Sequence, residues 1–309
     1  MKNETNVIVA KRLTSGDPAL FKSAVDRSTT FIRSRVREKG FARNLFEPTY
    51  VTAADLDRAV DSDMPIMILE KDMEARAYTV PFRGTGEAKY WDSKNFIITF
   101  HKYQSDQFTK SKLEMMTSKT SYDKLLENRI VEAMYRVEDE VVIKAMNAVV
   151  AEAETSKPGS QYLEVTGGLD KENLKIIIKM LSRLKMIPTE PGSDKDKPKF
   201  LMNTTLKQDL IDLGQLEIGD VGVAKNFNQG VTGVNRLLGL PIVTTIKDDL
   251  VPDDELFLVA PQDYSGRFMI LQDHTLFVET KMDMISFQSY AAMGFGIVNT
   301  NSIVKLKFV

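Results

Sequence analysis

Apolar residues recur at a helical spacing over residues 120–154, a stretch that contains neither glycine nor proline. Leucine, alanine, methionine, glutamate, arginine and lysine, which are strong helix formers, are abundant in it. At 1.5 Å per residue, the pattern predicts one helix about 50 Å long, which is about two to three times the average in globular proteins. We expect Thr120 to cap the first turn, with Asp123 reaching back to it, and Pro158-Gly159 to lie beyond the end.

Such a helix could belong to a coiled coil, a membrane span or a mixed domain. Its apolar positions do not keep a strict heptad over several repeats, which disfavours a coiled coil. No window of about 18 residues is both apolar and uncharged, so we expect no membrane-spanning helix. The remaining interpretation is a single long helix that packs across a β-sheet.

The chain before the long helix begins with a polar arm and a basic helix. Residues 1–16 are mostly polar and are expected to form a loose arm. Asp17 followed by Pro18 predicts the start of a helix, and Gly40 predicts its end. Over residues 22–43, seven basic residues stand against two acidic ones. A solvated helix face explains such a run, and contact with an acidic partner or with nucleic acid is the alternative.

Residues 50–116 contain short β-rich runs, which predict strands. Two of these runs flank the polar and aromatic segment 82–92, so we expect one long hairpin with this segment at its tip. An isolated hairpin is not stable in water, so it must pack on its own domain or on another subunit. The triplet Gly84-Thr85-Gly86 is no phosphate loop, because no Gly-Lys-Ser/Thr and no predicted helix follow it.

The chain after the long helix mixes helices with strands. Asp170 is expected to cap a second helix that ends at Pro188, and a third helix is expected to end at Gly214. Short apolar runs predict strands, and the last of them alternates apolar side chains with lysines, as a half-buried strand does. These runs lie at 199–202, 237–243 and 256–261, around Phe268 and Phe277, and at 284–298 and 304–308.

Composition limits the classes of function. The chain of 309 residues has a formal net charge of −2, so no global charge attracts nucleic acid or an anionic membrane. It has no cysteine, which excludes disulfides, thiolate metal sites and cysteine nucleophiles. No apolar segment near the N-terminus has the length of a signal peptide core, so synthesis in the cytoplasm is expected.

Residues that could perform catalysis are sparse. His101 and His274 are the only histidines and lie in separate predicted strands, which favours structural or exposed roles. The acidic groups at 61–63 and 253–255 lack the ligand spacing of a calcium loop and are interpreted as solvated turns. No hydrolase, P-loop or dinucleotide motif is present. We therefore expect no enzyme activity, no cofactor and no metal.

The order of the predicted elements is itself informative. An arm, a long hairpin, a long helix and a helix-rich middle are followed by Leu-Leu-Gly-Leu-Pro-Ile-Val at 237–243 and by a C-terminal pair of strands. The second short cue is the segment 293–306, which ends in Val-Asn-Thr-Asn-Ser-Ile-Val-Lys-Leu. This order resembles the major capsid proteins of tailed bacteriophages, which share the Hong Kong 97 fold. The resemblance covers essentially the whole chain and implies an α+β fold of that type.

The resemblance implies a division of the chain into the parts of that fold. Residues 1–49 would be the N-terminal arm, which reaches onto neighbouring subunits in the family. An axial domain and a peripheral domain would follow, the latter containing the extended loop and the spine helix. The implied bounds are 200–282 for the axial domain, 50–199 with 283–309 for the peripheral domain, about 76–108 for the extended loop and 120–154 for the spine helix.

The resemblance also implies a function and partners. The chain would be the structural subunit of an icosahedral viral shell, with hexamers and pentamers that enclose packaged double-stranded DNA and contact it without sequence specificity. A separate scaffolding protein, a portal and decoration proteins would be further partners, and no covalent crosslinks are expected. The subunit would be made and assembled in the cytoplasm of a bacterial host and would end in the virion capsid, with no membrane contact.

Two other functions stay open at this point. An encapsulin-type compartment that holds cargo would share the fold, and a cytosolic α/β enzyme with an unrecognised site is the remote alternative. If the chain is a shell subunit, its tip and its basic helix are where contacts between subunits are expected. The residues concerned are Phe82, Arg83, Gly84, Thr85, Gly86 and Trp91 in the extended loop, and Arg33, Arg35 and Arg37 in the arm.

Overall fold

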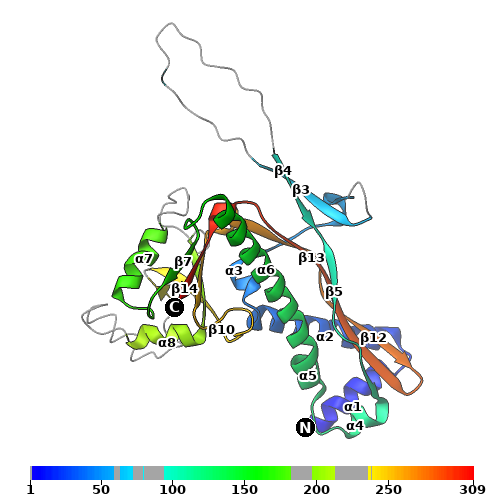
Figure 1. The fold of residues 1–309 in the computed structure, drawn as a ribbon. Helices are drawn as coiled ribbons and strands as arrows, with labels where there is room; N and C mark the ends of the chain where they lie inside the picture. The colour runs from blue at the N-terminus through cyan, green and yellow to red at the C-terminus, as the bar shows by residue number, and fades with distance from the viewer. Residues whose placement is uncertain are drawn as a thin grey trace.

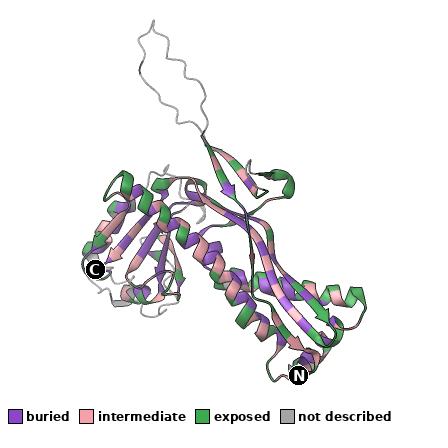
Figure 2. Ribbon diagram, turned by 45° about the vertical axis from the view of Figure 1, so that its right-hand side comes forward, coloured by how far each residue is buried: buried purple, intermediate pink, exposed green. Residues whose placement is uncertain are grey.

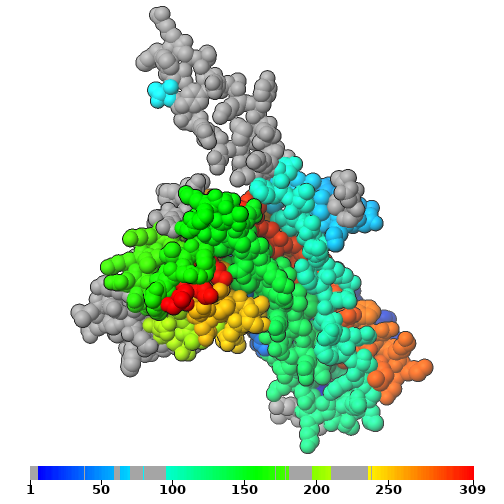
Figure 3. Space-filling model, viewed as in Figure 1, coloured from blue at the N-terminus to red at the C-terminus, as the bar shows by residue number. Residues whose placement is uncertain are grey.

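A computed structural model describes residues 2–58, 63–71, 79, 94–181, 197–212, 236–237 and 239–309. One long helix runs between a six-stranded sheet on one side and a long five-stranded sheet on the other (Figure 1). A small three-stranded sheet packs on one end of this body (Figure 3). No helix among the described residues has both the length and the apolar content to cross a membrane.

The N-terminal region forms helices that pack on the rest of the chain. The expectation of a loose arm over residues 1–16 was wrong, because Ala10 and Leu13 are buried in a core that includes the start of the long helix. The predicted bounds of the basic helix are confirmed: the Asp17 side chain accepts the Ala19 N–H, and Gly40 is the C-cap. The three helices are α1 (Lys2–Leu13), α2 (Pro18–Lys39) and α3 (Ala42–Leu45).

The predicted long helix is confirmed, but its predicted cap was wrong. The side chain of Asn6, in α1, accepts the Tyr122 N–H at 2.8 Å and donates to the Thr120 carbonyl at 3.0 Å. A residue 116 positions earlier in the chain therefore replaces the local cap expected from Thr120 and Asp123. The helix runs through α5 (Tyr122–Leu125), the π-helical η2 (Leu126–Val131) and α6 (Glu132–Ser156).

The long sheet is built on one antiparallel hairpin. Its strands β12 and β13 pair from Gly266↔Ile297 to Lys281↔Met284, with irregular register between Ile270 and Thr275. Strand β1 adds to β12 in parallel, and β5 and β6 pair with successive parts of β13. The strands are β1 (Pro48–Tyr50), β5 (His101–Gln104), β6 (Phe108–Ser111), β12 (Gly266–Lys281) and β13 (Met284–Ile297); the helix α4 (Lys112–Thr117) follows β6.

The six-stranded sheet carries α7 and α8 (Figure 1). The predicted cap of α7 is confirmed, since Asp170 accepts the Asn173 N–H at 2.8 Å. The alternation of the last strand is also confirmed, with Leu306 buried between two half-buried lysines. In sheet order the strands are β7 (Tyr162–Val165), β14 (Ile303–Phe308), β11 (Glu255–Val259), β8 (Lys199–Asn203), β10 (Leu240–Thr245) and β9 (Arg236–Leu237); the helices are α7 (Lys171–Leu181) and α8 (Thr204–Asp212).

The predicted domain bounds stay a prediction, and two strand pairings cross them. Strand β14 was placed with the peripheral residues 283–309, yet it pairs with β11 inside the six-stranded sheet. Strand β12 was placed inside the axial residues 200–282, yet it pairs along its length with β13. The predicted boundary therefore cuts through both sheets, because hydrogen bonding between strands distant in sequence decides sheet membership.

The base of the predicted hairpin is confirmed. Strands β3 and β4 pair antiparallel from Ile66↔Thr99 to Lys71↔Lys94, and β2 extends this sheet. The predicted tip, residues 82–92, lies outside the described residues. The elements here are η1 (Ala53–Asp55), β2 (Asp57–Arg58), β3 (Pro65–Lys71) and β4 (Lys94–Thr99); η4 (Thr300–Ser302) precedes β14, and α11 (Gln262–Ser265) precedes β12.

Buried residues occur along the whole length of the body (Figure 2), and their side chains form several cores rather than one. One lies within the six-stranded sheet and its helices, and another joins α1, α2 and the start of the long helix to the β12–β13 hairpin. The middle of α6 binds the two parts together, since Val142, Ile143 and Met146 share a core with residues of both large sheets. The long helix therefore connects the six-stranded sheet to the five-stranded sheet.

Candidate functional site

The three-stranded sheet presents an unpartnered apolar pair to solvent. Ile68 of β3 and Ile97 of β4 are cross-strand partners, and they are 40% and 62% exposed. The neighbouring cross-strand pair, Met67 and Ile98, lies on the other face and is covered: Ile98 is buried in a small core with Phe100 and Met269. One face of this small sheet is thus anchored to the body, while the other has no contact that covers it within the described chain.

Two glycines of β13 decide where this sheet sits. A Cβ atom at Gly294 would lie 2.9 Å from the Thr99 carbonyl oxygen, and one at Gly296 would lie 2.7 Å from Ile98 Cγ1. Real Cβ atoms do not approach so closely, so only glycine lets β4 cross β13 at this point. The Gly-Phe-Gly sequence at 294–296 therefore determines how the small sheet leaves the body.

A second exposed apolar group lies at the turn of the β12–β13 hairpin. Phe277, Met282 and Met284 are 53%, 103% and 43% exposed, and Met282 has a positive φ of 55°. A groove of about 350 Å³ adjoins this turn, between the end of β12 and the residues that link α1 to α2. Its apolar lining comes from Leu13, Pro18, Phe21 and Met282.

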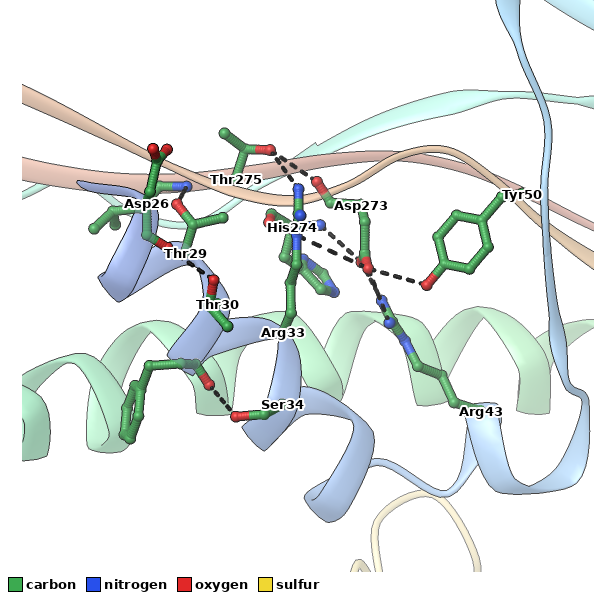
Figure 4. A network of polar contacts seen from close by, with 12 residues as sticks. Asp26, Thr29, Thr30, Arg33, Ser34, Arg43, Tyr50, Asp273, His274 and Thr275 are labelled. Carbon is green, nitrogen blue, oxygen red and sulfur yellow. Dashed lines mark hydrogen bonds and ion pairs between the residues drawn. The ribbon is translucent and has the colours of Figure 1, made fainter. Parts of the chain in front are cut away.

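A buried cluster of charges, of which Figure 4 shows Arg43, Asp273 and His274, ties the N-terminal helices to the long helix. Arg43 of α3 donates two hydrogen bonds to Glu138 of α6, at 2.6 and 2.8 Å, and one at 2.8 Å to Asp273 of β12. His274 Nε2 lies 2.7 Å from the same Glu138 carboxylate. Three segments far apart in the sequence are therefore held together by one guanidinium group.

The surroundings shift the pKa values of the acids in this cluster. Burial by itself raises the pKa of Glu138, but the hydrogen bonds from Arg43 and His274 outweigh it and hold the pKa below its ordinary value. Burial and the hydrogen bond from Arg43 oppose each other in the same way at Asp273, whose pKa is also lowered. Both carboxylates are therefore stabilised in the charged form by the cation that they share.

Asp139, the next residue of α6, holds the other side of α3. Its carboxylate accepts the Ala42 N–H at 2.8 Å and pairs with Lys247, whose ammonium lies 4.0 Å from the centre of the Tyr135 ring. Burial raises the pKa of Asp139 to about 6, and the charge of Lys247 only partly opposes this. Adjacent acids of one helix thus contact the N-terminal segment, β12 and the loop after β10.

Sequence reasoning missed this cluster, although a signal was present. Glu138 lies one helical turn after Met134 and one turn before Val142, and both of these apolar residues are buried. An acid within the apolar stripe of a helix must find a cation or hydrogen-bond donors, because an unpaired buried charge is costly. The position of Glu138 could therefore have indicated a buried partner, but not which one.

The three predicted arginines of the arm separate onto two sides of α2. Arg33 donates to the His274 carbonyl at 2.8 Å and lies 3.9 Å from Asp273. Arg35 lies on the other side, 3.9 Å from Glu127 of η2. Arg37 is exposed on the same side as Arg33. The predicted contact residues of the extended loop, Phe82, Arg83, Gly84, Thr85, Gly86 and Trp91, lie outside the described residues.

The candidate catalytic residues of the sequence are not brought together. His274 is fully buried in the cluster around Glu138, while His101 lies in β5, 3.2 Å from the Thr99 hydroxyl. Of the acids at 253–255, Glu255 pairs with Lys305 at 2.7 Å. Within the described ranges, no group of three or more histidine, aspartate or glutamate side chains could hold a metal ion.

Comparison with known sequences finds no relative: no family model matches the chain, and no curated protein does. Solved structures do match. A chain from Microbacterium phage Oxtober96 has a TM-score of 0.58 at 11% identity, covering 88% of this chain and 91% of that one. A chain from the mature capsid of bacteriophage PhiM1 has a TM-score of 0.54 at 10% identity, covering 88% of this chain and 87% of that one.

A third solved structure, the capsid of a native GTA particle, matches the chain to a similar extent. Its chain has a TM-score of 0.54 at 12% identity, with coverage of 88% of this chain and 91% of that one. At such low identity the likeness concerns the fold alone. The mixed helix and sheet architecture with one long helix is that of these phage capsid chains, which confirms the predicted Hong Kong 97-type fold.

Proposed function

We propose that the chain is the structural subunit of an icosahedral viral shell. In this proposal, copies of the chain form hexamers and pentamers that enclose packaged double-stranded DNA. The fold supports the proposal, since the chains of the PhiM1 and GTA capsids each match 88% of this chain. The observation that carries it is the exposed Ile68–Ile97 pair on the outer face of the small sheet, which lies at one end of the body (Figure 3).

An exposed pair of isoleucines on a projecting sheet favours burial against another molecule. Fully burying an isoleucine side chain stabilises a contact by about 1.5–3 kcal/mol. The pair lies at the base of the hairpin rather than in a cleft, so a neighbouring subunit is the partner that fits. Because every copy carries the same pair, the contact would repeat around a closed ring.

The turn of the β12–β13 hairpin supports a second contact between copies. Met282 is fully exposed there, beside the groove that Leu13 and Phe21 line. In a repeated contact, the exposed apolar turn of one copy can pack into the apolar groove of the next copy. We propose a scaffolding protein, a portal and decoration proteins as partners within a virion. Further contacts between copies are proposed for the loop residues Phe82, Arg83, Gly84, Thr85, Gly86 and Trp91.

The test is negative-stain electron microscopy of the purified protein over a concentration series, alone and with its scaffolding protein co-expressed, with nucleic acid assayed in the particles. Closed shells or hexameric rings are expected, and the shells should contain DNA. The variant Ile97→Asp should fail to assemble while its melting temperature stays near that of the wild type. Ile246→Asp is the matched control, because Ile246 is a single exposed isoleucine of a loop.

Each other outcome has a definite meaning. Shells that contain protein cargo and no nucleic acid would support an encapsulin-type compartment instead. Particles that stay monomeric with the scaffolding protein present would overturn the proposed function. Equal loss of assembly in Ile97→Asp and Ile246→Asp would show that the Ile68–Ile97 pair is not a specific contact between subunits.

A further inference from the structure

The basic residues of α2 divide between two faces of the helix. On one face, Lys39 pairs with Glu127 of η2 at 2.7 Å, and Arg35 lies 3.9 Å from the same carboxylate. On the other face, Arg33 and Arg37 are one helical turn apart and line an open groove. On one face the cations thus share an acid within the chain, while on the other Arg37 directs its charge to solvent.

This groove has a volume of about 720 Å³ and lies between α2 and β12, with α3 and β1 contributing at one end (Figure 4). Its lining includes three guanidinium groups and one carboxylate, that of Asp273. Leu271 is the single aliphatic side chain in the lining of the groove. The complete lining is Thr30, Arg33, Ser34, Arg37, Arg43, Tyr50, Leu271, Gln272, Asp273 and Thr275.

The three guanidinium groups of the groove differ in how far they are buried and in how many partners they have within the chain. Arg43 is almost fully buried and is satisfied by Glu138 and Asp273. Arg33 is oriented by its bond to the His274 carbonyl, yet 45% of its side chain stays exposed. Arg37 is exposed and has no ion-pair partner among the described residues. Two cations are therefore available to a ligand, and one of them is already positioned.

The chemistry of the lining favours a phosphate backbone over a protein segment. Guanidinium groups bind phosphate oxygens through two parallel N–H donors. Apart from Tyr50 and Leu271 the lining is polar or charged, so an apolar segment of a protein would have little surface to pack against. One helical turn, about 5.4 Å, separates Arg33 from Arg37 and spans one to two nucleotides of a strand.

We propose that the α2–β12 groove is a sequence-independent binding site for a nucleic-acid backbone, with Arg33 and Arg37 as its phosphate contacts. The site rests on the proposed function and extends it, because it assigns the contact with packaged DNA to named residues. Tyr50, whose hydroxyl lies 3.2 Å from Asp273, keeps an exposed ring at one end of the groove, where a deoxyribose of the backbone can pack.

The test measures binding of the unassembled full chain to a short labelled DNA duplex by fluorescence anisotropy over a series of salt concentrations. Arg37→Gln should reduce the slope of log K against log salt by about 0.9 and weaken binding about three- to tenfold at 0.1 M salt. Arg136→Gln is the matched control, because Arg136 is an exposed arginine of α6 paired with Asp249, and it should leave the slope unchanged.

Arg33→Gln should weaken binding in the same way, and Arg33→Lys, which keeps the charge but lacks the paired N–H donors, should keep the wild-type salt slope and recover only part of the affinity. Should Arg33→Gln fail to fold, as judged by its melting temperature, Arg37→Gln still decides the matter. Equal slopes for Arg37→Gln and Arg136→Gln would overturn the site. So would polyglutamate that binds as tightly as DNA and loses affinity equally in Arg37→Gln, since the ligand would then be an acidic protein.

Shell assembly, followed by electron microscopy, separates this site from the proposed function. Arg37→Gln shells that form normally but retain less DNA after a salt wash would support the site. A wild-type chain that binds DNA through Arg37 but never forms shells would leave the groove in place and overturn the shell function.

Discussion

Ile98 of β4 lies directly against Gly296 of β13, where a Cβ atom would stand only 2.7 Å from Ile98 Cγ1. The small sheet that carries the exposed Ile68–Ile97 pair is anchored through this contact and the adjacent one at Gly294. The absence of two Cβ atoms thus determines the direction of the projecting sheet, and through it the surface offered to another subunit.

Gly296→Ala should therefore impair assembly more than folding. The added methyl group forces Ile98 away, at a cost of about 1–3 kcal/mol as for other overpacked sites, and turns the small sheet out of position. Urea denaturation gives the loss of stability, and electron microscopy gives the loss of shells. Gly168→Ala is the control, since its nearest neighbour would be an ordinary 3.8 Å away. Normal shells from Gly296→Ala would show that the contact does not position the sheet.

Arg43→Met should strongly destabilise the chain. The substitution leaves Glu138, which is 1% exposed, without its main partner, and breaking a buried pair in this way costs about 3–5 kcal/mol. The free energy of unfolding in urea checks this. Arg136→Met, which breaks a pair that is more than half exposed, should cost at most about 1 kcal/mol. Similar costs for the two variants would contradict a structural role for the buried cluster.

Asn6→Ala should weaken the start of the long helix from a distance. The variant leaves the Tyr122 N–H without its acceptor, and the loss of such a cap costs about 1 kcal/mol. Hydrogen exchange at residues 122–125 should accelerate, and the melting temperature should fall. Ser121→Ala should have little effect, because Ser121 occupies the N-cap position without a side-chain cap bond. Unchanged exchange in Asn6→Ala would show that the cap does not hold the helix.

Asp139 should make stability depend on pH in the weakly acidic range. Its folded pKa of about 6 lies above its ordinary value of 3.8, so its contribution to stability is fully present below about pH 4 and is lost as the pH rises through 6. Two pKa units correspond to roughly 3 kcal/mol. Glu138 and Asp273 act in the opposite sense: their lowered pKa values contribute stability above the ordinary range, which is lost on further acidification.

A comparison with Asp139→Asn isolates this effect. The difference in unfolding free energy between the wild type and Asp139→Asn should fall as the pH rises from 4 to 7, because the variant lacks the titrating group and keeps Glu138 and Asp273. The exposed substitution Asp253→Asn serves as the matched control for the change from aspartate to asparagine. A flat difference for Asp139→Asn would mean that Lys247 compensates fully for burial.

Local sequence rules determined the regular elements of this protein. The apolar period of residues 120–154 predicted the long helix, Asp17-Pro18 and Gly40 predicted the bounds of α2, and Asp170 predicted the cap of α7. These features depend on residues within a few positions of one another, so the physics that decides them is present in the sequence itself. The order of the elements carried enough information to indicate the fold.

Tertiary structure alone decided what sequence reasoning missed. The polar α1 is helical because Ala10 and Leu13 are buried against other elements, and Asn6 finds the Tyr122 N–H only when α1 packs there. The same holds for the pairing of β12 with β13 and of β14 with β11, and for Arg43 between Glu138 and Asp273. Hydrogen bonds and ion pairs between distant positions form only after packing brings the groups together, and no local spacing encodes which partners will meet.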